Sequence, residues 1–402
     1  MASVRAKVKA ELLEWARVTA GFTVEDAAKK AAVDPGRVAA WEDPHGEDRP
    51  TINQLRMLAK SYRQPLSIFY LSKPPRGAPI MHDFRRLPGE VAQVYSPSLR
   101  LEIMSAYRRR TVALSLLEEL GMAAPKFTHR VSLFDGPEIA GAKARDVLGV
   151  NYELARQWRD DRKAYNGWRR AIEGTGVLVF QAVGVGVGEM RGFSIAEDTL
   201  PVIAVNKKDR VHGRIFSLLH EFIHLLLHES GLCDFDEDAL RPPAESRIEI
   251  FCNHAAGVAL VPRDELLREP IVVGRGEGNH HLWSDEELTA LGRIYGVSRE
   301  VVLRRLLILG RASQAYYGAR HVAFMGQYKR EEEEKPPPEK FMRNMPQEAV
   351  SNYGEAFTNL VVETYHQDRI PLSDAAQYLG VRAKHLPRVE RLLRGEGTAP
   401  AL

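Results

Sequence analysis

The pattern of apolar and polar residues predicts a mostly helical chain with one short region of strands. Apolar residues recur at helical spacing through most of the 402 residues. The period changes between residues 176 and 208, where 177–180, 190–195 and 202–205 have the composition of short buried strands. We therefore expect an α+β fold that is mostly helical.

The pattern in residues 1–75 predicts an all-helical domain. Thr23 is placed to cap one short helix, and Asp34, followed by Pro35, is placed to cap the next. Thr51 opens a further helix with the spacing of a capping box. Two short helices joined by a tight turn, the second of them exposed, are typical of a helix-turn-helix.

A longer apolar run contains the sequence His220-Glu221-Phe222-Ile223-His224. Residues four apart lie on one face of a helix, so His220 and His224 can each bring an imidazole to one metal ion. Glu221 is then close enough to act on a water at that ion, as in H-E-x-x-H zinc peptidases. The alternative is a pair of core histidines satisfied by hydrogen bonds.

A catalytic zinc site needs a third protein ligand. His228 lies eight residues beyond His220, roughly 12 Å along a straight helix, which is too far for one ion. We expect the ligand to be Glu249, which shares a polar stripe with Glu245 and Asn253 on a second apolar helix. Glu245 is the rival ligand, and the other alternative is that Glu249 pairs with an arginine at the surface.

Composition and charge place the chain among soluble globular proteins. Hydrophobic residues make up 44% and charged residues 27%, and the net charge of +3 is too small to argue for nucleic-acid binding by itself. The two cysteines, Cys233 and Cys252, exclude a disulfide framework and fit a reducing cytoplasm. No signal peptide or bilayer-length apolar stretch is present, so we expect a cytoplasmic protein with no membrane role.

Two linker-like stretches suggest the domain organisation. Residues 72–95 are rich in proline and glycine, and residues 330–340 contain four successive glutamates followed by three prolines. The expected domains are a helix-turn-helix domain at 1–75, a metallopeptidase-like domain with leading helices at 76–330, and a linker with a C-terminal helical segment at 331–402. Within the last of these, residues 371–381 have a helix-turn-helix cadence, which predicts docking on the preceding domain or binding of a partner.

The N-terminal stretch resembles the XRE/Cro-type helix-turn-helix domain over residues 23–31, 34–42 and 49–59. In that family the third helix enters the major groove. The resemblance implies that Arg37 and Ala40 face DNA, with three cations near phosphates: Lys29, Lys30 and Arg49. The chain departs from the family where Glu25 and Asp26 begin the second helix, so a protein-docking module is the alternative.

Residues 176–262 resemble the ImmA/IrrE family of bacterial metallopeptidases. The matching segments are Gly176–Phe180, Arg191–Phe193, Pro201–Asn206, His220–His228 and Glu249–Asn253, ending at Val261-Pro262, where methionine is common in place of Val261. The resemblance implies that His220, His224 and Glu249 hold the metal. Zinc suits these ligands, and manganese or iron fits the same set.

A short sheet ahead of an H-E-x-x-H helix is the zincin arrangement. In such folds an edge strand can pair with an extended peptide substrate through main-chain hydrogen bonds. We expect that edge to be residues 190–195 or 200–205.

These patterns predict an intracellular zinc-dependent endopeptidase in which Glu221 is the general base. The resemblance implies that the substrate is an XRE-type repressor or an antitoxin, cut in a stress or mobile-element response. The alternative is a transcriptional regulator that binds DNA through residues 23–49 and whose metallopeptidase-like domain is a sensor or partner-binding module. The sequence leaves the oligomeric state open.

Overall fold

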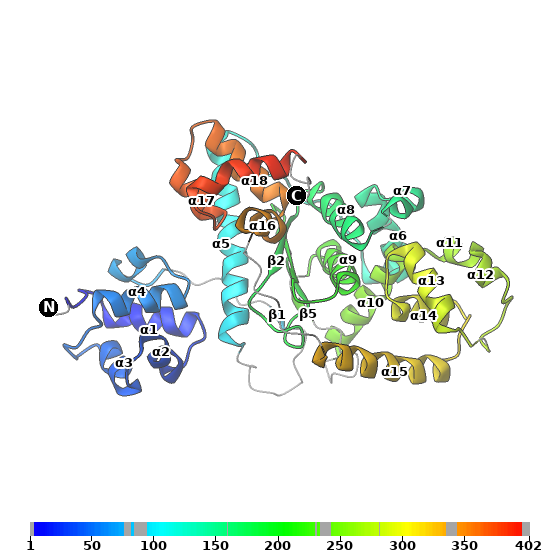
Figure 1. Ribbon diagram of the computed structural model, residues 1–402, viewed down its shortest axis with the longest axis horizontal. Coiled ribbons are helices and arrows are strands. Elements are labelled where there is room, and N and C mark those ends of the chain that lie inside the picture. The colour runs from blue at the N-terminus through cyan, green and yellow to red at the C-terminus, as the bar shows by residue number, and fades with distance from the viewer. Residues whose placement is uncertain are drawn as a thin grey trace. The chain divides into compact units, whose positions relative to one another are not determined.

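The computed structural model describes residues 4–75, 82–83, 95–158, 160–229, 231–233, 243–280, 282–334 and 344–395, and it is mostly helical with one small sheet (Figure 1). The α+β expectation is therefore confirmed. The chain divides into two compact units. The N-terminal unit comprises Met1–Ile80 and Gly89–Arg108, and the main unit comprises Met81–Pro88 and Arg109–Leu402. Among the described residues, none of the helices has both the length and the apolar character needed to cross a membrane.

The N-terminal unit contains helices α1 (Ala10–Thr19), α2 (Val24–Ala31), α3 (Pro35–Glu42) and α4 (Ile52–Ser61), together with the first half of α5 (Pro97–Glu119). The predicted caps are present: Thr23 and Thr51 form capping boxes, and the Asp34 carboxylate accepts from the Gly36 amide. Each cap satisfies an amide that a helix start leaves without an intrahelical partner. The helices surround a core that includes Trp41 and Leu55.

The main unit is built on a five-stranded sheet. Its strands are β1 (His82–Asp83), β2 (Leu178–Ala182), β3 (Gly192–Ile195), β4 (Val202–Asn206) and β5 (Gly231–Cys233). They lie in the order β1-β5-β3-β4-β2. β2 runs parallel to β4, whereas β3 is antiparallel to both β4 and β5.

The expectation that residues 190–195 or 200–205 form an edge strand is wrong. β3 and β4 each have a partner on both sides, and the edges of the described sheet are β1 and β2. The error has a topological cause, because β5 follows the metal-motif helix in the chain and then pairs with the free side of β3. Neighbours in sequence therefore do not give the order of the strands.

Helices cover the sheet and enclose the core of the main unit. These helices are α6 (Pro137–Leu148), α7 (Tyr152–Gln157), α8 (Asp161–Glu173), α9 (Val211–Leu227), α10 (Pro243–Leu260), α11 (Arg263–Arg268), α12 (Pro270–Val273), α13 (Asp285–Tyr295), α14 (Arg299–Ile308) and α15 (Gln314–Glu333). α9 packs on β3 and β4, and α8 packs on β2. Every residue of β2, β3 and β4 is buried, which explains their mostly apolar sequence.

Close packing fixes the position of α10 against α6. A β-carbon at Gly141 of α6 would lie 2.5 Å from the carbonyl oxygen of Ala255 and 2.5 Å from the β-carbon of Val258, both on α10. Only glycine allows this approach. The contact matters for the site because α10 also carries Glu249.

The C-terminal helices α16 (Met345–His366), α17 (Leu372–Tyr378) and α18 (Leu386–Leu393) belong to the main unit. α15 continues to Glu333, into the stretch that was predicted to be a linker. α16 is interrupted at Gly354, whose φ is +83°.

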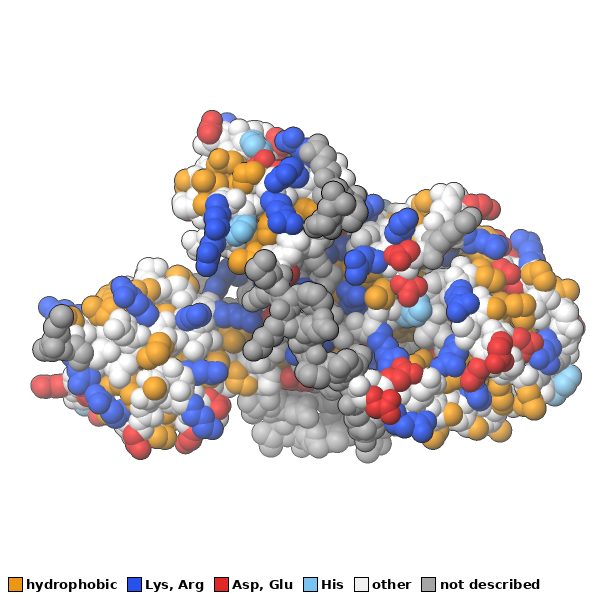
Figure 2. All heavy atoms as spheres, viewed as in Figure 1, with side chains coloured by type: hydrophobic (Ala, Val, Ile, Leu, Met, Phe, Trp, Pro, Cys, Tyr) orange, Lys and Arg blue, Asp and Glu red, His pale blue; other side chains and the backbone are white. Residues whose placement is uncertain are grey.

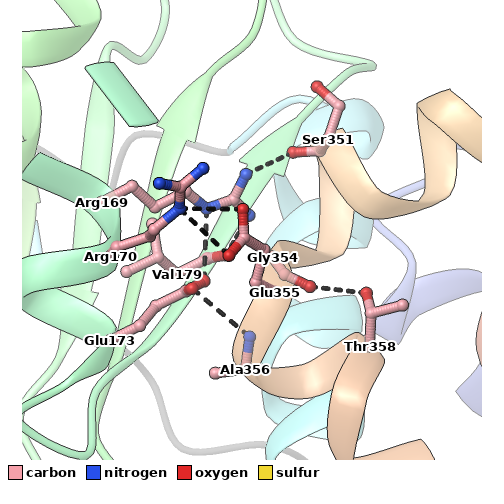
Figure 3. Close-up of polar contacts among 9 residues, drawn as sticks. All are labelled: Arg169, Arg170, Glu173, Val179, Ser351, Gly354, Glu355, Ala356 and Thr358. Carbon is pink, nitrogen blue, oxygen red and sulfur yellow. Dashed lines mark hydrogen bonds and ion pairs between the residues drawn. The ribbon is translucent and has the colours of Figure 1, made fainter. Parts of the chain in front are cut away.

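Polar contacts dock α16 on α8 and β2 (Figure 3). The buried guanidinium of Arg169 donates to the carbonyl oxygens of Ser351 (2.6 Å) and Val179 (2.5 Å). The carboxylate of Glu173 accepts from the amide of Ala356, just after the break in the helix. The C-terminal segment therefore docks on α8 and β2 of the main unit.

Candidate metal centre

The H-E-x-x-H motif lies in the second half of α9, which is buried almost all round. The helix ends where His228 adopts a left-handed conformation with a φ of +60°. The side chain of His228 is 45% exposed and lies 3.8 Å from Asp198. His228 is therefore not part of the motif's site, as the distance argument predicted.

His220, His224 and Glu249 meet inside the protein. The Nε2 atoms of His220 and His224 are 3.1 Å apart. Oε2 of Glu249 lies 3.4 Å from Nε2 of His220, and Oε1 lies 3.2 Å from Nε2 of His224. All three residues are buried. The alternative in which Glu249 pairs with an arginine at the surface is wrong, whereas the side chain of Glu245 lies outside the described residues.

The geometry of this cluster fits a divalent metal ion. Two ligand atoms that each lie about 2.0–2.1 Å from a tetrahedral zinc ion are about 3.3–3.4 Å apart. The two imidazole nitrogens, 3.1 Å apart, come close to this separation, and they lie 3.4 Å and 3.2 Å from different oxygens of Glu249. Two imidazole nitrogens and one carboxylate oxygen, one from each residue, are also a donor set typical of zinc. The cluster can therefore hold a metal.

Protonation in the cluster also favours metal binding. Burial lowers the pKa of His220, so its imidazole is neutral at physiological pH, which is the form that binds metal. Burial by itself would raise the pKa of Glu249, but the adjacent imidazoles of His220 and His224 hold it well below its usual value. Glu249 is therefore a carboxylate, the form that coordinates a cation.

Glu221 is fully buried on the same helix and faces β3. A β-carbon at Gly192, the first residue of β3, would lie 2.6 Å from Oε1 of Glu221. The absence of a side chain at Gly192 is therefore what gives the Glu221 carboxylate its place beside the strand. The importance of Gly192 could not be predicted, because the sequence does not show which side chain packs against a glycine at the start of a strand.

A cavity of about 1180 Å³ lies one helical turn from the cluster. Its lining includes Phe216, four residues before His220, and Asn253, four residues after Glu249. Neither the three cluster residues nor Glu221 line it. The cavity is therefore adjacent to the metal cluster and does not contain it.

The residues predicted to contact DNA lie in the N-terminal unit. Lys29 and Lys30 are exposed, and Ala40 is half-buried. Arg37 is exposed and lies 3.6 Å from Asp48. Arg49 donates to three backbone carbonyl oxygens, those of Val8, Gly46 and Asp48. The Arg49 guanidinium therefore holds neighbouring backbone segments together, a role that is separate from the predicted contact with a phosphate.

The main unit is similar to a known peptidase family. Residues 172–307 match the IrrE N-terminal-like domain, Peptidase_M78. This range contains the metal cluster, Glu221 and four of the five strands. No curated protein matches the chain, and neither does any solved structure. The match supports the ImmA/IrrE resemblance and a metallopeptidase-like function, and it does not extend to the N-terminal helices or to α16–α18.

Proposed function

We propose that the chain is an intracellular endopeptidase whose metal is zinc. The observation that carries the proposal is the buried cluster of His220, His224 and Glu249, with ligand-atom separations that suit one ion. The IrrE N-terminal-like match over residues 172–307 supports peptide-bond hydrolysis as the reaction. Manganese or iron would fit the same donors.

Glu221 is the proposed general base. When bound, zinc supplies the Lewis acidity that lowers the pKa of a water molecule and polarises a carbonyl. Glu221 takes a proton from the attacking water and delivers it to the amide nitrogen as the carbon–nitrogen bond breaks. Glu221 follows His220 on α9, and its carboxylate packs against Gly192 of β3. Burial of the carboxylate away from bulk solvent suits this exchange of one proton.

The proposed substrate is a protein, an XRE-type repressor or an antitoxin, cut in a stress or mobile-element response. This proposal rests on the resemblance of residues 176–262 to the ImmA/IrrE family. We further propose that the N-terminal unit recruits this partner. Residues 23–49 contain four Lys and Arg residues against seven Asp and Glu residues, a balance that favours a protein surface over DNA phosphates.

Cleavage of a co-encoded repressor tests this function directly. Purified protein is incubated with each XRE-type repressor encoded beside it, and the fragments are identified by mass spectrometry. The proposal expects one internal cut, which is lost in Glu221→Gln. A mobility shift on the protein's own promoter that is lost in Lys29→Ala/Lys30→Ala/Arg37→Ala, without any cleavage, would favour the regulator that binds DNA through residues 23–49.

A further inference from the structure

The C-terminal helices α17 and α18 have the arrangement of a helix-turn-helix. Residues 379–382 separate Tyr378, the last residue of α17, from a short 3₁₀ turn (Ala383–His385) that runs directly into α18. A three- to four-residue turn that contains glycine is typical of this motif. α16 packs against both helices and completes a three-helix group.

The turn requires glycine for two reasons. Gly380 has a φ of +59°, in the left-handed region that L side chains rarely adopt. A β-carbon there would also lie 2.9 Å from the hydroxyl oxygen of Tyr353 on α16. The turn therefore has a defined conformation that is fixed against the third helix.

α18 buries one face and exposes a basic one. Leu386 and Val389 point into the three-helix group and are buried. Arg388 and Arg391 of α18 are exposed and lie three residues apart on one helical face, and the exposed Lys384 precedes them in the 3₁₀ turn. Figure 2 shows Lys and Arg side chains over the region of α17 and α18, with few acidic side chains among them.

The basic residues of this segment outnumber its acidic ones. Among the described residues, none of the exposed cations Arg382, Lys384, Arg388, Arg391 and Arg394 makes an ion pair. The acidic residue of α18, Glu390, lies 3.2 Å from His366 of α16, and its side chain is 18% exposed. Residues 371–395 contain five Lys and Arg residues and two Asp and Glu residues, the reverse of the balance in residues 23–49.

We propose that residues 371–394 bind duplex DNA through the exposed basic face of α18. In a helix-turn-helix the second helix enters the major groove, and the N-terminal residues of that helix reach base edges. Arg382 and Lys384 hold this N-terminal position, and Arg388 and Arg391 continue the face toward the phosphates. Because α16 docks on α8 and β2, DNA bound here is held by the same unit that carries the metal cluster.

This proposal goes beyond the peptidase function and does not depend on it. A protein without cleavage activity would still bind duplex DNA through α18. The N-terminal unit is the competing DNA-binding element, since Lys29, Lys30 and Arg37 are also exposed. The test therefore removes three cations from each element in turn.

The experiment measures fluorescence anisotropy of a labelled 30-bp duplex of arbitrary sequence titrated with the full chain at several salt concentrations. Each phosphate contact contributes about 0.9 to the slope of log K against log salt concentration. The triple variant Lys384→Ala/Arg388→Ala/Arg391→Ala is expected to lose about 3 from the magnitude of this slope and to bind more than about tenfold more weakly at low salt. The charge-matched variant Lys29→Ala/Lys30→Ala/Arg37→Ala is expected to bind as the wild type does.

Folding is controlled by the conservative variant Lys384→Arg/Arg388→Lys/Arg391→Lys, which keeps the charge and should keep both the affinity and the slope. Unchanged far-ultraviolet circular dichroism and melting temperature show that the alanine variant is folded. The proposal is overturned if the wild type fails to bind the duplex at low salt. That result is expected if the basic face binds an acidic protein instead. The proposal is also overturned if the α18 variant binds like the wild type, or if only the N-terminal variant loses binding.

Discussion

Gly192, the first residue of β3, packs directly against the side chain of Glu221. A β-carbon at Gly192 would lie 2.6 Å from Oε1 and 3.0 Å from Cγ of Glu221. β3 and α9 therefore meet at the side chain of the proposed general base. Any side chain at Gly192 must displace the carboxylate, the strand or both.

Replacement of Gly192 by alanine should impair cleavage more than metal binding. A displacement of about 1 Å in a catalytic group can cost about 10²-fold in rate, and overpacking costs about 1–3 kcal/mol of stability. We expect Gly192→Ala to lose about 10²-fold in kcat/KM while its zinc content stays that of the wild type. Gly186→Ala is the matched control, because a β-carbon there meets nothing within 4 Å. Full activity in Gly192→Ala would show that Gly192 is not needed to position the carboxylate of Glu221.

Replacement of Glu221 by glutamine separates chemistry from metal binding. The amide keeps the shape of the side chain but cannot accept the proton from water. We expect the zinc content to persist and the rate of cleavage to fall by about 10²–10⁴-fold, the usual contribution of a general base. The readout is the initial rate of repressor cleavage beside the metal content of the same sample. If the variant still cuts every substrate of the parent protein, Glu221 is not the base.

Removal of the metal should lower the melting temperature of the wild type. An ion that binds only the folded chain stabilises it by about 2.7 kcal/mol when its concentration is 100 times Kd. For domains of about 150–250 residues each kcal/mol corresponds to about 2–4 °C. We therefore expect a chelator to lower the melting temperature by several degrees, and zinc to restore it. His224→Ala serves as the control, and a chelator effect of equal size in that variant would show that the ion binds elsewhere.

Two neighbouring arginines test how the C-terminal helices are held. Arg169 is buried and pairs with Glu173 at 3.3 Å, whereas Arg170 is 61% exposed and pairs with Glu355 at 3.0 Å. Breaking a buried pair costs about 3–5 kcal/mol, and an exposed pair contributes about 0–1 kcal/mol. We expect Arg169→Ala to destabilise the protein strongly and to speed proteolytic release of residues 344–395, while Arg170→Ala changes little. Equal effects of the two substitutions would contradict the docking that Figure 3 shows.

The cluster of His220, His224 and Glu249 was predictable because each of its residues belongs to a recognisable pattern of spacing along a helix. His220 and His224 are one turn apart on an apolar helix, and Glu249 belongs to a polar stripe on another apolar helix. The caps at Thr23 and Thr51 were predictable for the same reason, since a capping box spans three residues.

The features that depend on distant parts of the chain were not predictable. The edge-strand expectation failed because β5 inserts beside β3 after α9 has intervened. The roles of Gly192 and Arg49 depend on what packs against them, and one sequence does not reveal these neighbours. The docking of α16 through Arg169 joins residues 182 positions apart.

Elemental analysis of the purified protein tests the central claim most directly. Wild type, His224→Ala and Glu249→Ala are purified side by side without added metal, and the zinc, manganese and iron content of each is measured per chain. We predict one zinc ion per wild-type chain and loss of that ion in both variants. A wild type without bound metal, or a variant that keeps the full wild-type content, would contradict it.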